Sequence, residues 1–386
     1  MTNRKPKITF LINHVAFFVS HRLPIAIKAR KNNYEVSLLT GQAGSKSMEA
    51  EAVETLKSFN IAHKRMLFTS SSTNIFNNFL GLIQLIRHMI KERADIIHMA
   101  SPKAIIFGGI AAHFFKNKGL VFAISGMGYA FSASSNIFHR RFWVKIIFNL
   151  LAKISFRHKK KIFIVQNLDD RELLIKKNYA KDNEIVKIQG SGVDLSLYEK
   201  IEFQKKEKTI LFVGRVINDK GIREFVEAVK ELKNKGRDWN FKVLGAYDYQ
   251  NPSSVSEKDI KNWQKNYPIE FLGHVNNTQD FLRTASIVCL PSYREGMPKA
   301  LLEASAAGCA VVTTDVIGCR ESIIDNLTGL LVRPYDSKSL SNAIYKLMKD
   351  RNLREEMGRN GIQHAKKNFD LEVVTERILQ IYKTFL

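Results

Sequence analysis

Short apolar runs alternate with longer amphipathic segments along the whole chain. In the first half, amphipathic segments such as 74–93 and 140–156 predict helices between the apolar runs. The runs themselves predict strands at 7–13, 35–40, 95–99, 119–124 and 161–166. Because continuous apolar strands separated by helices are typical of a parallel sheet covered on both faces, we expect a doubly wound α/β domain here.

The same pattern restarts in the second half and predicts a second domain of the same kind. Its predicted strands are 208–214, 241–245, 269–272, 286–291, 309–314 and 329–332, and residues 338–386 predict consecutive helices. The polar, aperiodic stretch between the two series predicts a linker. The predicted division is therefore an N-terminal domain at 1–190, a linker at 191–207, a C-terminal domain at 208–365, and a final helix at 366–386 that packs back on the N-terminal domain. Ligands of open parallel sheets bind beyond the carboxyl ends of the strands, so we expect a site in a cleft between two facing domains.

The composition is that of a soluble globular protein. The 386 residues suit two domains, with 45% hydrophobic and 25% charged residues. The sequence contains no run of eighteen apolar residues, so we expect no transmembrane helix. The short basic N-terminus predicts a strand rather than a signal peptide. The three cysteines, Cys289, Cys309 and Cys319, form no CxxC pair or Cys/His cluster, so we expect buried thiols in a reducing compartment and no metal site.

Positive charge is concentrated in the first half of the chain. The net charge is +23; residues 1–200 contribute +18, with 31 Lys and Arg against 13 Asp and Glu. The remaining residues contribute +5. This half should face an acidic partner, which leaves a nucleic acid, an anionic membrane or a phosphorylated substrate. No motif that reads DNA or RNA is present, so we expect no nucleic-acid partner.

The stretch 290–308 carries the strongest chemical signal. A strand ends here, a turn follows with Glu295, and Pro298 suits the first position of a helix that contains Glu303. The N–H groups of 296–299 would then lie at the positive end of the helix dipole, where anions bind. The two carboxylates could accept hydrogen bonds from sugar and ribose hydroxyls. On spacing alone, ordinary solvent-facing helix charges remain the alternative.

A second loop supplies two cations at the end of another predicted strand. Arg215 and Lys220 lie in the sequence LFVGRVINDKG at 211–221, and a helix begins near Gly221. Cations in such a loop can clamp phosphates, and arginine can do so with two parallel hydrogen bonds. Ordinary surface charge is the alternative.

Taken together, these stretches resemble a known family. The combination RVINDKG and EGMPKALLEA resembles the retaining glycosyltransferases of family 4, which have the GT-B fold of two Rossmann-like domains facing across a cleft. Glu295 and Glu303 match that family's E-x7-E signature. Further stretches over nearly the whole chain resemble its capsule and O-antigen branch: SHRLPIA (20–26), DIIHMASPKA (95–104), SGMGYAF (125–131), VQNLDDRE (165–172), GSGVDL (190–195) and DVIGCRESI (315–323).

The resemblance implies a role for each matching residue. Arg215 and Lys220 would hold the donor diphosphate and neutralise the leaving nucleotide. Glu303 would bind the ribose hydroxyls, and Glu295 would contact the transferred sugar, so Glu295, Arg215 and Lys220 are the expected catalytic residues. The remaining donor contacts would be Gly296, Met297 and Pro298 around the sugar, with Gly273 and Val275 bordering the nucleobase.

The first loop departs from the family pattern. Residues 13–22 contain no glycine, and Ser125 with Gly126 stands where many members have a histidine. We therefore expect this loop to shape the acceptor site, with His21 and Arg22 as phosphate contacts. The candidate acceptor residues are His14, His21, Arg22, His98, Lys103 and Ser125; for His98, a packed strand histidine is the alternative.

The resemblance also implies the substrates. The expected reaction moves an N-acetylhexosamine or deoxy-hexosamine from a uridine diphosphate donor to a polyprenyl-diphosphate-linked sugar, in surface polysaccharide or glycan synthesis. No cofactor or metal is expected besides this co-substrate, because Asp169-Asp170 suits a helix start better than a metal site. A GT-B sugar-nucleotide 2-epimerase, or a non-enzymatic basic protein that binds membrane or nucleic acid, are the alternatives.

Two segments suit contact with a membrane surface. Segment 137–161 combines basic residues with Phe, Trp, Ile and Leu, and segment 74–93 carries Phe76, Phe79 and Leu80. Basic residues near a surface attract anionic lipids. We therefore expect a cytoplasmic protein peripherally bound to the inner face of the bacterial cytoplasmic membrane, although a core helix with a basic rim would have the same sequence.

Overall fold

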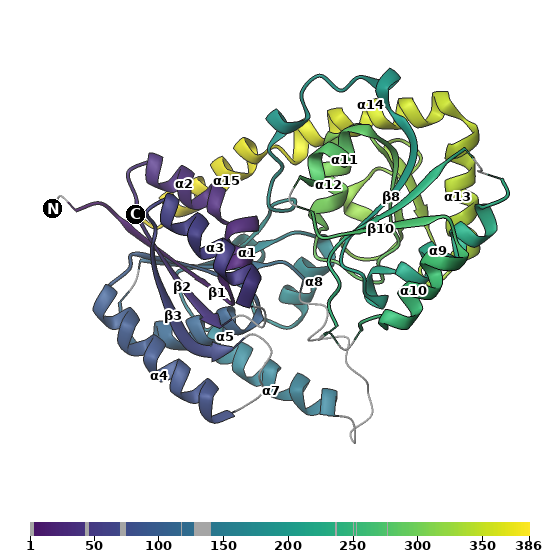
Figure 1. The fold of residues 1–386 in the computed structure, drawn as a ribbon. Helices are drawn as coiled ribbons and strands as arrows, with labels where there is room; N and C mark the ends of the chain where they lie inside the picture. Colours follow the sequence, from purple (N-terminus) through teal and green to yellow (C-terminus); the bar gives the residue numbers. More distant parts are fainter. Residues whose placement is uncertain are drawn as a thin grey trace. The chain divides into compact units, whose positions relative to one another are not determined.

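The computed structural model describes residues 4–42, 46–69, 75–116, 118–126, 140–235, 238–249, 251, 253–275 and 277–386. They fall into two compact units (Figure 1): unit 1 is Met1–Ser191 with Val373–Leu386, and unit 2 is Gly192–Glu372. The stretch predicted as a linker belongs to unit 2 from Gly192 onward, because Val193 and Tyr198 are buried in that unit's core.

Unit 1 is built on one parallel sheet in the order β3-β2-β1-β4-β5-β6-β7. Its strands are β1 (Lys7–Ile12), β2 (Glu35–Gln42), β3 (Ala62–Thr69), β4 (Ile96–Ala100), β5 (Gly119–Ile124), β6 (Lys161–Val165) and β7 (Ile185–Lys187). The five predicted strands are confirmed. The sequence did not predict β3 and β7, because β3 has three consecutive polar residues after Ala62 and β7 has only three residues; both are edge strands.

Helices cover both faces of this sheet. One apolar cluster lies under α1 (Val15–His21), α2 (Leu23–Lys31), α3 (Lys46–Ser58) and α15 (Leu371–Lys383). The other lies under α4 (Ile75–Glu92), α5 (Pro102–Ala111), α7 (Arg140–Ser155) and α8 (Leu168–Lys176). From residue 373 onward, α15 belongs to unit 1, and its Val374, Ile378 and Tyr382 lie in the first cluster.

Unit 2 repeats the architecture with six parallel strands in the order β10-β9-β8-β11-β12-β13. Its strands are β8 (Glu207–Val213), β9 (Asn240–Leu244), β10 (Ile269–Gly273), β11 (Ala285–Leu290), β12 (Ala310–Thr314) and β13 (Gly329–Val332), which confirms all six predictions. Its helices are α9 (Ile222–Leu232), α10 (Glu257–Asn266), α11 (Thr278–Thr284), α12 (Lys299–Ala306), α13 (Ser337–Lys349) and α14 (Arg351–Asn368).

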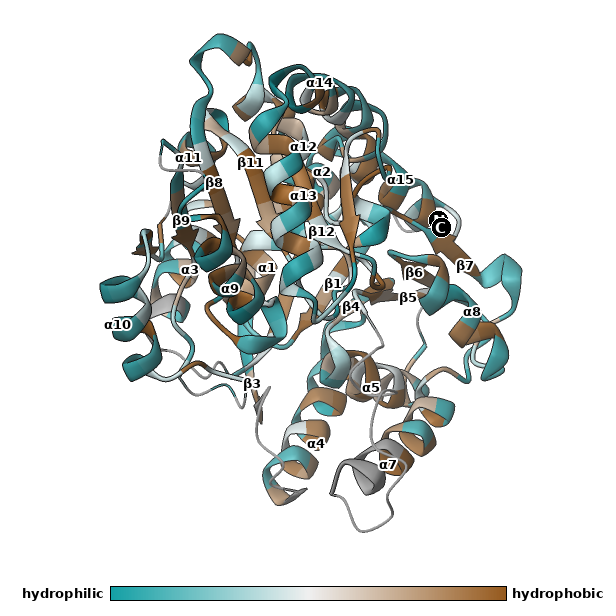
Figure 2. Cartoon of the chain, turned by 90° about the vertical axis from the view of Figure 1, so that its right-hand side faces the viewer, coloured by the Kyte–Doolittle hydropathy of each residue, from teal (hydrophilic) through white to brown (hydrophobic). Residues whose placement is uncertain are grey.

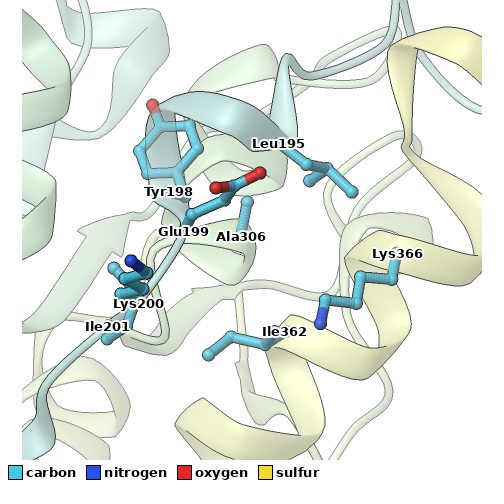
Figure 3. A pocket seen from close by; sticks show the side chains of 8 residues that line it. All are labelled: Leu195, Tyr198, Glu199, Lys200, Ile201, Ala306, Ile362 and Lys366. Atoms are coloured by element: carbon cyan, nitrogen blue, oxygen red, sulfur yellow. The ribbon is translucent and has the colours of Figure 1, made fainter.

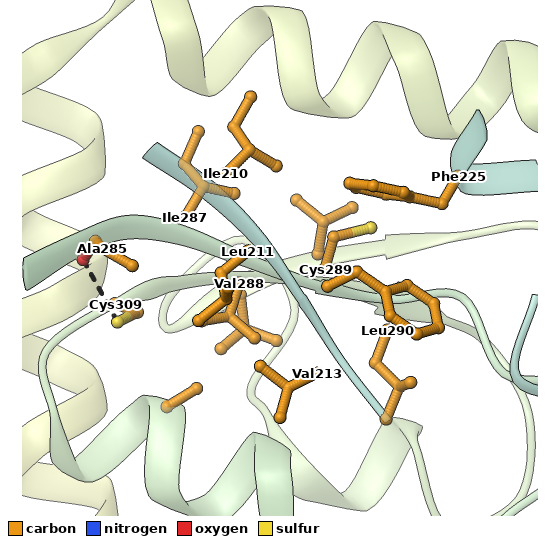
Figure 4. Packing of buried hydrophobic residues seen from close by; sticks show 14 of the residues in the cluster. Ile210, Leu211, Val213, Phe225, Ala285, Ile287, Val288, Cys289, Leu290 and Cys309 are labelled. Carbon is orange, nitrogen blue, oxygen red and sulfur yellow. Dashed lines mark hydrogen bonds between the residues drawn. The ribbon is translucent and has the colours of Figure 1, made fainter. Parts of the chain in front are cut away.

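The strands of unit 2 form its apolar core. Side chains from β8 and β11 interdigitate there, among them Leu211, Val288 and Leu290, with Phe225 packing from α9 (Figure 4). Both sheets are hydrophobic in their strands, while the helices alternate hydrophobic and hydrophilic positions (Figure 2). The three cysteines are free and buried, as predicted. Two doubly wound α/β units are therefore confirmed.

The strand order fixes where each unit can hold a ligand. In unit 2 the chain runs outward from β8 to β10 on one side and from β11 to β13 on the other, so the order reverses between β8 and β11. In unit 1 the same reversal lies between β1 and β4. Loops on the two sides of such a reversal diverge at the carboxyl ends of the strands and leave a crevice for a ligand. The loops that follow β8 and β11 contain Arg215, Lys220 and Glu295 of the predicted donor site.

Candidate active site

The loops after β8 and β11 are joined at Asp219. The carbonyl of Asp219 accepts hydrogen bonds from Tyr293 N (2.9 Å) and from the buried Ser292 hydroxyl (3.0 Å). Next to it, Gly221 has a φ of +72°, and a Cβ at this position would lie 2.0 Å from the carbonyl oxygen of Pro291. Only glycine allows this approach, so Gly221 holds the two loops in contact.

Lys220 and Glu295 form an ion pair across these loops. Their side chains are 19% and 12% exposed, and the Ser292 hydroxyl, which has one proton for Asp219 O and Glu295 together, lies 2.7 Å from Glu295 Oε1. The sequence placed both residues in the site but did not predict this pairing or the role of Ser292. Opposite charges that are largely removed from water attract strongly. The pair therefore fixes the Glu295 carboxylate next to a cation that a phosphate could also bind.

A third loop supports the turn that carries Glu295. Glu295 N donates to Ile317 O at 3.2 Å, and a Cβ on Gly318 would lie 2.5 Å from the carbonyl oxygens of both Glu295 and Gly296. Cys319 follows in the same loop, where burial and the nearby Glu295 raise the pKa of its thiol to about 12. The stretch DVIGCRESI therefore packs directly behind the turn.

Arg215 and Lys220 both lie in the loop after β8, residues 214–221, which we call the clamp loop. Arg215 is more exposed than Lys220. Its guanidinium donates to Asp248 Oδ2 at 2.7 Å, and the two side chains are 52% and 30% exposed. Asp248 follows β9, and nothing in its local sequence marked it as a partner of Arg215. The structure thus provides both predicted cations at the carboxyl end of β8, each with an acidic partner from a neighbouring loop.

Helix α12 begins beyond the turn. Pro298 is its N-cap residue rather than its first helical residue as predicted, because its backbone is extended with ψ 113°. Glu303 lies in the helix with its side chain 20% exposed, and its carboxylate is 3.4 Å from Lys299 Nζ. Burial raises the pKa of Glu303, and Lys299 partly offsets this increase. Met297 and Pro298 are buried at the helix start, while Gly296 is half-buried.

The predicted nucleobase border lies two strands from the clamp. Gly273 ends β10, and its carbonyl accepts a hydrogen bond from Gly245 N at 2.8 Å, which ties the ends of β9 and β10 together. Gly273 and Val275 are half-buried. All predicted donor residues therefore lie at the carboxyl ends of strands of unit 2, in the loops that follow them, or in α12.

Three of the acceptor candidates follow adjacent strands of unit 1. His14 comes after β1 and caps α1, accepting from Phe17 N at 3.2 Å; Lys103 comes after β4 and Ser125 after β5. Burial lowers the pKa of His14 and of Lys103. Lys103 Nζ lies 3.4 Å from Asn78 Oδ1. Most of the SGMGYAF motif that continues from Ser125 lies outside the described residues.

Two of the other acceptor candidates, His98 and Arg22, are buried, whereas His21 is half-buried. His98 is fully buried: its Nδ1 lies 2.6 Å from the Tyr382 hydroxyl, and its ring stacks on Phe10. This placement matches the packed strand histidine and contradicts direct contact with an acceptor, since His98 points from β4 into the core beneath α15. Arg22 is only 5% exposed and donates to His21 O at 3.1 Å, and burial lowers its pKa to about 10. His21 stacks on Phe17.

A separate pocket of unit 2 lies at the opposite end of α12. It has a volume of about 510 Å³, and Tyr198, Ala306 and Lys366 are among its lining side chains (Figure 3). None of the predicted donor residues lines it. Because the loops after β8 and β11 carry the charged side chains at the strand ends, they remain the better candidate for a phosphate ligand.

Three further sequence expectations concern a helix start, a metal site and membrane-spanning helices. Asp169 and Asp170 lie in the first turn of α8, whose cap Asn167 accepts from Asp170 N at 2.7 Å, so the predicted helix start is confirmed. Over the described ranges, no three His, Cys, Asp or Glu side chains gather in a way that could hold a metal ion. Over the same ranges, every helix is too short or too polar to cross a membrane.

Family models match both halves of the chain. The model for glycosyl transferases group 1 matches residues 196–364, which include the clamp loops, and the model described as glycosyl transferase 4-like matches residues 7–167. The two matches together cover every strand of both sheets except the edge strand β7.

Curated relatives and solved structures are similar over nearly the full length. The capsular polysaccharide biosynthesis glycosyltransferase CapM of Staphylococcus aureus is 25% identical over 92% of each chain. The N,N'-diacetylbacillosaminyl-diphospho-undecaprenol alpha-1,3-N-acetylgalactosaminyltransferase of Campylobacter jejuni is 29% identical over 97% of this chain and 98% of its own. The crystal structure of Anabaena Alr3699/HepE with UDP and glucose shares the fold, with a TM-score of 0.76 and 17% identity over 98% of this chain and 99% of its own.

Proposed function

The chain belongs to the glycosyltransferases of group 1, with the GT-B fold, and we propose that it transfers a sugar from a uridine diphosphate donor to a polyprenyl-diphosphate-linked sugar. The observation that carries the donor half of this proposal is the pair of joined loops at the order reversal of unit 2. They bring Lys220 and Glu295 into contact and supply Arg215 at the same strand end.

Each residue has a task in the proposed reaction. The bond between the anomeric carbon and the β-phosphate oxygen breaks, and the oxygen of an acceptor hydroxyl bonds to the same face of the sugar while its proton passes to the leaving diphosphate. Negative charge develops on the leaving diphosphate, which Arg215, Lys220 and the N-terminus of α12 stabilise. Glu295 contacts the sugar at the reacting end, and Glu303 accepts hydrogen bonds from the ribose hydroxyls. The two cations neutralise the diphosphate, so the proposal needs no metal or other cofactor.

Substitution of the clamp cations tests this proposal. Arg215→Ala or Lys220→Met should reduce kcat at least about a hundredfold, because preorganised charges of this kind each stabilise a transition state by several kcal/mol. Arg223→Ala is the matched control, since Arg223 is equally exposed, follows the same loop and pairs with Asp259. Arg215→Ala leaves no buried partner unpaired, so it separates catalysis from folding. Unchanged turnover in Arg215→Ala would reject the clamp.

The acceptor half of the proposal is supported by the relatives and by charge. The Campylobacter jejuni relative is named for a diphospho-undecaprenol substrate. A diphosphate-linked acceptor is acidic, and the first 200 residues carry a net charge of +18. His14, Lys103 and Ser125 follow three adjacent strands of unit 1 and are the residues that we assign to the acceptor. His21 at the end of α1 and Arg22 directly after it are the further phosphate contacts that we propose. The donor sugar that we propose is an N-acetylhexosamine or its deoxy form.

We also propose that unit 1 binds to the anionic inner face of the cytoplasmic membrane. Helices α4 and α7 both pack on α5 (Figure 2). Both also expose apolar side chains. The exposed set is Phe76, Phe79, Leu80 and Ile90 on α4 and Ile146, Ile147, Leu150 and Ile154 on α7. Basic residues follow α7 at Arg157, Lys159 and Lys160. An apolar face with neighbouring cations suits lipid headgroups; segment 137–139 and the side chains of 140–145 lie outside the described residues.

Liposome flotation tests the membrane contact. The protein should float with vesicles that contain anionic lipid, and Leu150→Glu should weaken this binding, because it puts a carboxylate on the apolar face. Leu327→Glu is the control, since Leu327 is comparably exposed, 46% against 60%, but lies in unit 2. Equal absence of wild-type binding with neutral and anionic vesicles would remove the membrane proposal and leave the transfer reaction untouched.

An epimerase of the same fold remains the competing enzyme. Incubation of the nucleotide sugar without acceptor distinguishes the two reactions. Appearance of a C2 epimer of the donor would favour the epimerase, whereas transfer that requires an added polyprenyl-diphosphate sugar supports the proposal.

A further inference from the structure

Asp248 forms a hydrogen-bonded ion pair with the guanidinium of Arg215. The two side chains meet at 2.7 Å on the surface of unit 2, and each keeps part of its area open to solvent. Arg215 is one of the two cations that we assign to the donor diphosphate. The residue that would grip the ligand is therefore already paired with a carboxylate.

The loop that carries Asp248 is fastened to the clamp loop. Backbone hydrogen bonds join Val216 N to Ala246 O (3.0 Å) and Asn218 N to Ser253 O (2.8 Å). The Asp248 carboxylate also accepts from Asn251 Nδ2 at 3.2 Å. These contacts hold Asp248 opposite Arg215, so the pairing is a built feature of the two loops and not a chance meeting of long side chains.

From this arrangement we infer that Asp248 is a competing counter-ion: it holds Arg215 while no diphosphate is bound and competes with the nucleotide for that cation. The inference rests on the proposed function. A guanidinium forms the same paired hydrogen bonds with carboxylate and with phosphate, so the two anions seek the same donors. A carboxylate left beside a bound diphosphate also repels it. Asp248 thus weakens the grip on the nucleotide product and favours its release.

Isothermal titration with uridine diphosphate tests the competition. Asp248→Asn keeps the side-chain shape but removes the charge, and it should bind uridine diphosphate about two- to fivefold more tightly than the wild type, the range expected from an exposed ion pair. Loss of structure would weaken binding, so a gain in affinity cannot come from a merely structural role. Asp248→Glu should return the affinity toward the wild-type value.

Two further variants locate the effect. Asp259→Asn removes the carboxylate of a similar pair, with Arg223 at 2.8 Å, and should leave the affinity unchanged. In an Arg215→Ala background, Asp248→Asn should gain at most a small part of the increase, because the contested cation is gone. Raised salt should reduce the difference between wild type and Asp248→Asn.

The results separate this inference from the proposed function. If the wild type binds uridine diphosphate and Asp248→Asn binds it no more tightly, the competition is refuted and the proposed function stands. A gain of the same size in the Arg215→Ala background would also refute it. If the wild type binds no nucleoside diphosphate in a set with uridine, guanosine, adenosine and cytidine bases, the proposed function fails, and this inference fails with it.

Discussion

Replacement of Gly221 by alanine should separate the two loops that form the donor site. At a φ of +72°, a residue with a Cβ costs roughly 1–2 kcal/mol more than glycine. The new Cβ would also lie 2.0 Å from Pro291 O, where ordinary contact begins near 3.4 Å. Backbone shifts forced by such overpacking cost about 1–3 kcal/mol. The total is about 2–5 kcal/mol, a large part of the stability of an ordinary domain.

Gly273 provides a matched control for this change. Its φ is +70°, but a Cβ there would have no neighbour within 4 Å. Gly273→Ala should therefore cost only the conformational part, roughly 1–2 kcal/mol. The two variants therefore differ by the overpacking cost alone, about 1–3 kcal/mol. For a unit of this size, this cost corresponds to a melting temperature about 2–12 °C lower for Gly221→Ala than for Gly273→Ala.

Thermal melting followed by tryptophan fluorescence suits this comparison, since Trp239 and Trp263 are both buried in unit 2. Gly221→Ala should also lose more nucleotide affinity than its melting temperature accounts for, because Lys220 precedes the displaced residue. Equal melting temperatures for the two alanine variants would refute the claim that contact at Pro291 holds the loops.

Four other predictions concern the site and its surroundings. Burial raises the pKa of Glu303, so the folded state binds more protons than the unfolded chain and loses stability as pH rises. Glu303→Gln should therefore have a higher melting temperature than the wild type at pH 8, and a smaller increase at lower pH. Its nucleotide binding should weaken. The pKa of His98 lies well below its ordinary value because of burial, so wild-type melting temperature should fall as pH drops below about 6.5. Tyr382→Phe removes the hydroxyl bonded to His98 and should lower the free energy of unfolding by about 1 kcal/mol in urea titrations. Lys206→Met should lower it by several kcal/mol, about 2–4, since Lys206 Nζ donates to the carbonyls of Leu282, Ala285 and Ala307.

The sequence predicted the fold well because its strands are buried on both faces. Eleven strands were expected from apolar runs, and all eleven are present. The two strands that were not expected lie at the edges of one sheet, where one side of the strand has no neighbour and polar residues are tolerated. The apolar signal weakens where burial weakens.

The candidate site was predictable only in part. Residue spacing and the family resemblance identified Arg215, Lys220 and Glu295 as a group. They could not identify Ser292 or Asp248, because Ser292 contacts Asp219, 73 residues away, and Asp248 contacts Arg215, 33 residues away. For His98, a polar residue in an apolar strand suggested function, but its partner Tyr382 lies 284 residues away.

The return of α15 to unit 1 sets an order for assembly on the ribosome. Unit 2 is a continuous segment, so all of its residues are available once Glu372 has been synthesised. Unit 1 must wait for Val374, Ile378 and Tyr382, which cover the face of its sheet that contains Phe10. The half of the protein that is translated first is thus the half that is completed last, and until then its apolar sheet face is open to chaperones.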